Sequence, residues 1–145
     1  MKLILLAGLV GLVGACGDDG AKLPDAAVAA DANLAIDAAP ARETIIATQP
    51  LQPGELVEAI MHGGPGDTAL LHLSAPTATM DWNIHSHASG HAVTVYEELG
   101  KLTVDYPFTP GANGDWFLLI RNSGTVDMSV QVDAKLYGAM TWAWQ

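Results

Sequence analysis

The stretch TMDWNIHSH at residues 79–87 alternates between two kinds of side chain and decides the fold class. Taking every second residue separates a mostly apolar set from a polar set: Met80, Trp82, Ile84 and Ser86 against Asp81, Asn83, His85 and His87. Successive side chains of a β-strand point to opposite faces of the sheet, so a period of two indicates a strand with one buried face. We therefore predict a strand here whose polar face carries two histidines.

The same pattern continues through residues 42–145, where turn residues recur every eight to twelve positions. Short, evenly spaced strands of this kind are typical of an antiparallel β-sandwich. Eight or nine strands are predicted, over residues 43–48, 55–62, 68–74, 79–87, 92–98, 101–108, 115–122, 125–137 and 139–144. The apolar run at 116–120 suits the centre of a sheet, and no part of this region shows helical periodicity. The fold class is therefore all-β.

Residues 106–122, YPFTPGANGDWFLLIRN, resemble a signature of jelly-roll and GOLD-type sandwiches in secreted proteins. In those proteins an aromatic-Thr-Pro turn precedes a Gly-Asp-aromatic strand that ends in Arg-Asn. The resemblance implies a jelly-roll-like sandwich, and its families act mostly as binding or accessory modules. A fold alone does not define a function.

The first fifteen residues have the composition of a signal peptide. After Lys2, residues 3–13 form an apolar run of about eleven residues, shorter than the ~20 that a membrane-spanning helix needs. Val13-Gly14-Ala15-Cys16 then resembles the lipobox of bacterial lipoproteins. The resemblance implies that the chain is cut before Cys16, whose thiol receives a diacylglycerol and whose new amino group is acylated. The competing interpretation is a secreted protein with one free cysteine.

Residues 16–41 are expected to form a lipidated start and an acidic, disordered spacer. The segment is rich in Ala and Asp and has no aromatic residue, so it cannot bury enough apolar surface to offset its ordering entropy. The alternative is a short alanine-rich helix of marginal length. We expect a lipid-anchored location in the cell envelope, and Gly17 after the cysteine favours the outer membrane of a Gram-negative bacterium.

The composition disfavours several classes of function. Sixteen acidic against six basic residues give a net charge of −10, so nucleic-acid binding is not expected. Cys16 is the only cysteine, which leaves no disulfide and no thiol nucleophile. The sequence has no nucleophile elbow, phosphate loop or dinucleotide fingerprint. We therefore predict that the protein is not an enzyme.

His85 and His87 are the first candidate site, because two imidazoles on one strand face lie about 6.6 Å apart along the strand. Neutral imidazole is the commonest metal ligand, so copper or zinc is the expected metal, with His91 or His72 as a further ligand. The competing interpretation is solvated histidines on a polar sheet face.

Whether His91 joins the pair depends on the hairpin turn. A three-residue loop at 88–90 places His91 opposite His87, on the same face. A two-residue turn at 89–90 pairs His85 with Thr94 and sends His91 to the other face. The second register buries the valines of the returning strand, and it is the one that we expect.

Trp142 and Trp144 are the second candidate site. They lie two residues apart, so they share a face of the last strand, where an exposed pair could stack on sugar rings or hold a peptide. Aromatic residues in a sandwich are more often part of the core.

Taken together, the sequence predicts a lipid-anchored envelope protein that presents a non-catalytic β-sandwich module. The module is expected to bind an envelope protein or a small ligand. A metal-binding lipoprotein that uses the histidines is the first alternative, and a carbohydrate-binding module is the second.

Overall fold

The computed structural model describes residues 40–87 and 90–145 and contains nine β-strands in these ranges. They are β1 (Glu43–Leu51), β2 (Leu56–Gly63), β3 (Thr68–Ser74), β4 (Met80–Ser86), β5 (Val93–Lys101), β6 (Thr103–Phe108), β7 (Gly114–Asn122), β8 (Met128–Tyr137) and β9 (Thr141–Trp144). The expected signal peptide, the lipidation site Cys16 and nearly all of the acidic spacer lie outside the described residues.

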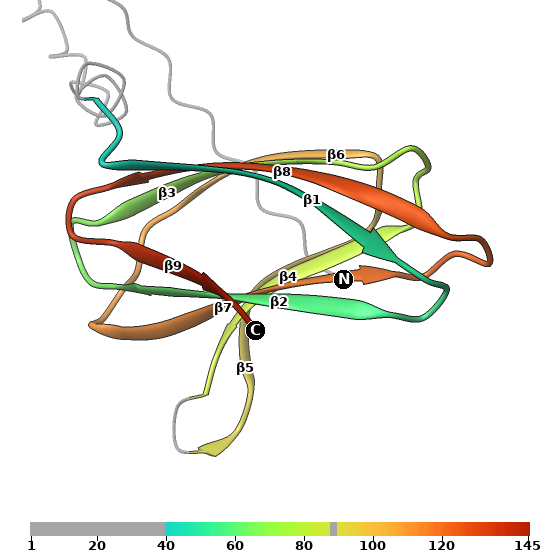
Figure 1. Cartoon of the computed structure of the whole chain (residues 1–145). Helices are drawn as coiled ribbons and strands as arrows, with labels where there is room; N and C mark the ends of the chain where they lie inside the picture. Colours follow the sequence, from blue (N-terminus) through green and yellow to red (C-terminus); the bar gives the residue numbers. More distant parts are fainter. Residues whose placement is uncertain (1–39, 88–89) are drawn as a thin grey trace, which may run out of the picture.

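The strands form two antiparallel sheets that pack face to face (Figure 1). The first has the order β1-β8-β3-β6 and the second has the order β5-β4-β7-β2-β9. The first eight strands are thus arranged as a jelly roll, and β9 adds an edge strand beside β2. The prediction of an all-β, jelly-roll-like sandwich is confirmed. Over the described ranges, no helix is long and apolar enough to cross a membrane.

The core lies between the sheets and is supplied by alternate residues of the central strands, as the period-two pattern predicts. From β4 the inward residues Met80, Trp82 and Ile84 are all buried. The indole of Trp82 contacts two tyrosine rings, with centroids 5.4 Å from Tyr96 on β5 and 5.3 Å from Tyr106 on β6. These aromatic contacts join the two sheets at their β5–β6 side.

Two strand ends differ from the sequence prediction. Gln49-Pro50 was expected to stop the first strand, but β1 continues to Leu51 and Pro50 lies opposite Ser129. Proline has no backbone N–H to donate. An edge strand tolerates it because the N–H groups on one of its sides have no neighbouring strand to bond to. Leu99-Gly100 was expected to be a turn, yet β5 continues through both residues to Lys101.

Three valines are exposed, among them the two valines of β5 that the expected register would bury. Val126 is 63% exposed because β8 begins only at Met128, which leaves Val126 in the preceding turn. Val93 and Val95 are 49% and 51% exposed. A register shift between Ile84 and His85 pairs Ile84 with Tyr96, so Tyr96 packs against the core in place of Val95.

Asn122 is the buried polar residue that holds one end of the sandwich together. Its side-chain amide donates to the carbonyl oxygens of Leu51 at 3.1 Å and Val126 at 2.8 Å, and its oxygen accepts from the Gly124 N–H at 2.9 Å. The side chain is fully buried, so each of these partners would lose its hydrogen bond in a dry site without the amide.

Replacing Asn122 by Asp keeps the shape of the side chain but removes both N–H donors. The buried carbonyl of Leu51 and the partly buried carbonyl of Val126 lose their donor, and a carboxylate is placed in the core. We expect a loss of roughly 2–4 kcal/mol in the free energy of unfolding. Urea denaturation measures it, with the exposed Asn113→Asp as the matched control. Equal free energies of unfolding in the two variants would show that the hydrogen bonds of the Asn122 amide do not hold this end of the sandwich together.

Candidate functional site

The candidate site lies on the outer face of the second sheet, where the β4–β5 hairpin meets β7. We call it the histidine site and define it by His85 and His87, with Asn83, Glu58 and Phe117 around them. In the unbroken pairing of β4 with β7, His85 lies opposite Phe117. Its neighbours along β4, Ile84 and Ser86, therefore point to the other face.

Hydrogen bonds define the protonation of the two imidazoles. Nδ1 of His85 lies 2.9 Å from Oδ1 of Asn83, and an amide oxygen can only accept, so Nδ1 of His85 carries a proton. Nε2 of His85 lies 3.1 Å from Nε2 of His87. In a neutral His85 the Nε2 atom is an acceptor, so the Nε2–H of His87 donates to it. The two rings share one proton between them.

Aromatic stacking holds both imidazoles in place. The ring of Phe117 stacks on His87 with centroids 4.4 Å apart and on His85 with centroids 5.3 Å apart. His85 is only 6% exposed although it lies on the outward face, whereas His87 is open to solvent. The interpretation of this face as polar and solvated is therefore wrong for His85.

The electrostatics of the site favour a neutral His85. Burial lowers the pKa of His85, and the nearby imidazole of His87 lowers it further, while the Glu58 carboxylate raises it. Oε1 of Glu58 is 3.6 Å from Nε2 of His85 and comes from β2, two strands away. The largest of these effects is desolvation of the imidazolium, so His85 presents an uncharged imidazole beside the Glu58 carboxylate.

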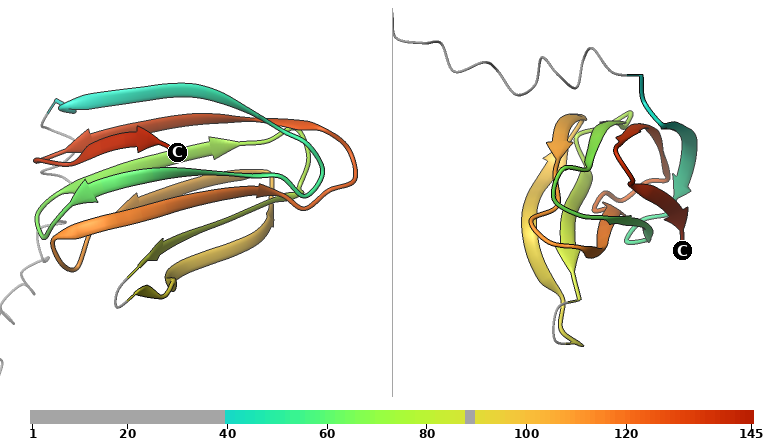
Figure 2. Two further views of the ribbon diagram at one scale, coloured as in Figure 1. Left: turned by 60° about the horizontal axis from the view of Figure 1, so that its bottom comes forward. Right: turned by 90° about the vertical axis from the view of Figure 1, so that its left-hand side faces the viewer.

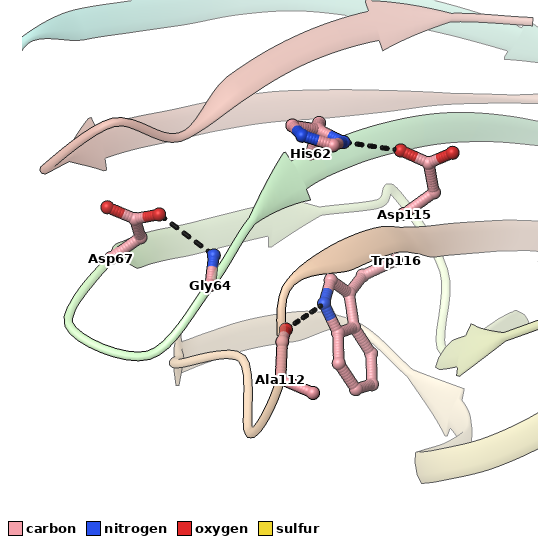
Figure 3. A network of polar contacts seen from close by, with 6 residues as sticks. All are labelled: His62, Gly64, Asp67, Ala112, Asp115 and Trp116. Carbon is pink, nitrogen blue, oxygen red and sulfur yellow. Dashed lines mark hydrogen bonds and ion pairs between the residues drawn. The ribbon is translucent and has the colours of Figure 1, made fainter. Parts of the chain in front are cut away.

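A groove of about 340 Å³ opens next to the exposed ring. His87, Phe117, Trp116 and Asp115 are among the side chains that line it, together with the turn before β7. Polar contacts hold two of these lining residues: Asp115 is 2.7 Å from Nδ1 of His62, and the indole N–H of Trp116 donates to Ala112 O at 3.3 Å (Figure 3).

Asp67 fixes the neighbouring turns. Its carboxylate accepts from the backbone N–H of Ala139 at 2.6 Å and from that of Gly64 at 2.8 Å (Figure 3 shows the latter). These two hydrogen bonds, led by that from Ala139, lower the pKa of Asp67. The turn before β3 and the turn before β9 are thus tied to one carboxylate at this end of the molecule.

The remaining histidines are not part of the pair. His72 lies on the other sheet, 2.7 Å from Asp105. No hydrogen bond or ion pair found in residues 40–87 and 90–145 joins His91 to His85 or His87. In the same ranges, no group of three or more His, Cys, Asp or Glu side chains is placed to hold a metal ion. The three-histidine set stays a prediction, of which the structure brings two members together.

The hairpin register near its tip is the one that we expected. Ser86 lies opposite Val93 and His85 lies opposite Thr94. This is the register that separates His91 from the other two imidazoles.

Trp142 and Trp144 lie on β9 opposite Met61 and Ala59, which are fully buried. Both indoles are therefore turned toward the core and are only partly exposed. Their rings meet edge to face at 80°, with centroids 5.3 Å apart, so they do not form one flat stacking platform. The carbohydrate hypothesis gains no support from this arrangement.

Phe117, Asn83 and Glu58 were not recognised as parts of a site from the sequence. Phe117 belongs to the apolar run at 116–120, and a continuous apolar run does not show which of its residues face outward. Asn83 was placed on the face of His85, and that spacing of two residues was the only signal available. Glu58 is distant in sequence and reaches His85 across β7.

By its topology the chain is a jelly-roll β-sandwich with one added edge strand. No protein-family model matches the sequence, and no curated protein matches it either. Among solved structures, it is similar to PliG of Aeromonas hydrophila, a periplasmic inhibitor of g-type lysozyme. The TM-score is 0.50 at 8% identity, over 65% of this chain and 86% of that one. A mitogen of Yersinia pseudotuberculosis gives a TM-score of 0.46 at 13% identity, over 66% and 86%. At this identity the likeness shows the fold alone.

The lowered pKa of His85 predicts a pH dependence of stability. The unfolded chain takes up a proton at His85 near pH 6.5, while the folded chain resists it. The stabilising contribution is therefore complete above about pH 6.5 and is lost as the pH falls from there through the lowered pKa. Urea midpoints between pH 8 and pH 5 should fall less steeply in His85→Gln than in the unsubstituted chain. The exposed His91→Gln is the control, and the idea fails if both variants keep the original slope.

Proposed function

We propose that the chain is an envelope lipoprotein whose jelly-roll domain binds a partner protein without catalysing a reaction. The acyl chains on Cys16 hold it to the membrane, and the acidic spacer keeps the domain away from the membrane surface. The binding surface is the β4–β5 hairpin together with the groove beside His87.

The proposal of an anchor is supported by the order of features at the start of the chain. A basic residue, a short apolar run, small residues and the only cysteine follow one another within sixteen residues. Several acyl chains, at about 0.8 kcal/mol for each buried CH₂ group, make a firm anchor without a membrane-spanning helix.

The observation that carries the proposal of binding is the projection of the hairpin. Its far end extends past the rest of the sandwich in two views (Figures 1 and 2). Among the described strands, β5 pairs only with β4, and its outer side carries no partner. Val93 and Val95 are both about half exposed there. An open strand edge with apolar side chains is a surface that a protein partner can cover.

Charge and the structural comparison also support a protein partner. With a net charge of −10 the chain favours a partner that presents basic residues, since complementary charge speeds association. PliG, which has a similar fold, is a periplasmic protein that inhibits an enzyme. A module of this architecture can thus act through binding alone.

The anchor predicts that substitution of the cysteine removes the lipid. In a Gram-negative host fed radiolabelled palmitate, the unsubstituted chain should carry the label and sediment with membranes. Cys16→Ser should carry none, because serine has no thiol to accept the diacylglycerol. Asp19→Asn is the matched control and should be labelled normally. Label on the Cys16→Ser chain would contradict the proposal.

The binding surface predicts where a partner can be captured. A photo-crosslinking amino acid at Val93, in the full chain expressed in its membrane, should give one dominant protein adduct. The same group at the exposed Ser129, on the other sheet, should give at most about a tenth as much. A second substitution, Val95→Glu, should reduce the adduct at Val93 severalfold. Equal yields from both positions would rule out the hairpin as the binding surface.

A further inference from the structure

We propose that Nε2 of His85 and Nε2 of His87 together chelate one divalent transition-metal ion, with copper(II) the preferred ion. The site needs no third histidine. It shares His87 with the groove of the proposed binding surface, but it uses the outer face of β4 and not the open edge of β5, so copper can be tested without the partner protein.

The distance between the two nitrogens fits a chelate. Metal–imidazole bonds of about 2.0–2.1 Å that meet between a right angle and the tetrahedral angle hold their nitrogens roughly 2.9–3.4 Å apart. The Nε2 atoms of His85 and His87 are 3.1 Å apart. A metal ion would replace the hydrogen bond between the rings, and the Nε2 proton of His87 would move to Nδ1 of the same ring, so that both Nε2 atoms offer a lone pair.

The surroundings orient His85 as a ligand. Metal-binding histidines usually donate their other ring N–H to an oxygen, which fixes the ring and directs the free lone pair toward the metal. The Nδ1–H of His85 donates to Asn83 at 2.9 Å in this way. Phe117 stacks on both rings, so little side-chain entropy remains to be lost on binding.

The charge at the site also favours a cation. The carboxylate of Glu58 lies 3.6 Å from Nε2 of His85, close enough to attract a bound ion. It does not form a set of three metal ligands with the two histidines. His87 is exposed, so water can reach the ion and fill its other coordination positions.

A site with only two nitrogen ligands leaves the other coordination positions of the metal free, so it imposes little geometry. The intrinsic affinity of each ion for imidazole then decides which metal binds most tightly. Divalent ions bind such ligands in an order that rises to copper and falls again at zinc, and imidazole suits both metals. Copper(II) should therefore bind more tightly than nickel(II) or zinc(II).

Titration of the full chain with copper(II) tests the site. Calorimetry measures the affinity and the number of ions bound, and electron paramagnetic resonance identifies the ligands. Every variant carries Cys16→Ser, so that the thiol cannot bind the ion. We expect one equivalent of copper bound, with hyperfine splitting from two nitrogens. His87→Ala should weaken binding at least tenfold, and Glu58→Gln should weaken it severalfold. His91→Ala and His72→Ala should leave it unchanged.

His87 is exposed, so His87→Ala should fold normally, and circular dichroism checks this before the titration. His85→Gln is a second variant that retains a polar side chain at the buried position and should also lose binding. Unchanged affinity in His87→Ala would overturn the proposal. Loss of affinity in His91→Ala would also overturn it, because the ion would then be held at the hairpin tip by a different set of ligands.

Discussion

The register of β4 against β7 is the constraint on which the rest of the structure depends. It places Ile84 opposite Leu118, both fully buried, and His85 opposite Phe117 on the outer face. A slip of one residue would exchange the two faces, exposing the apolar residues and bringing the histidine into the core. The free energy gained by burying the inner face therefore also determines which imidazole meets which aromatic ring.

This register gives one face of a single strand two unlike histidines. His85 is covered by its neighbours and kept neutral, while His87 remains open to water and to the groove. Neighbouring strands of the sheet supply the residues around the two histidines, since Phe117 comes from β7 and Glu58 from β2. The rigid centre of the sheet thus carries a polar pair, and the projecting hairpin beside it carries the exposed valines.

Much of the fold could be predicted from the sequence because it follows from local alternation. The period of two in residues 79–87 identified the inward face of β4, and the turn residues separated nine strands close to their observed bounds. The sequence predicted Val95 wrongly because the register shift beside Ile84 depends on packing across the sheet. Proline in β1 was misread for a related reason, since only the sheet order shows that this strand lies at an edge.

The site was predicted only in part. His-x-His on one strand face was sufficient to mark His85 and His87, but their closeness comes from rotamers that Phe117 and Asn83 impose. The burial of His85 could not be foreseen, because a histidine among polar residues has the same pattern whether or not neighbouring strands cover it. Residues such as Asn122 and Glu58 act through partners far away in the sequence, which alternation does not reveal.

The polar pair at the centre of this sheet consists of His85 and His87, held in order and sharing one proton. Long-range ¹H–¹⁵N correlation spectra of the imidazole rings near pH 7.5 test this most directly. Nδ1 of His85 should be protonated, its Nε2 should be a bare acceptor, and Nε2 of His87 should carry the shared proton. A His85 protonated at Nε2, or tautomers that average freely in both rings, would contradict it.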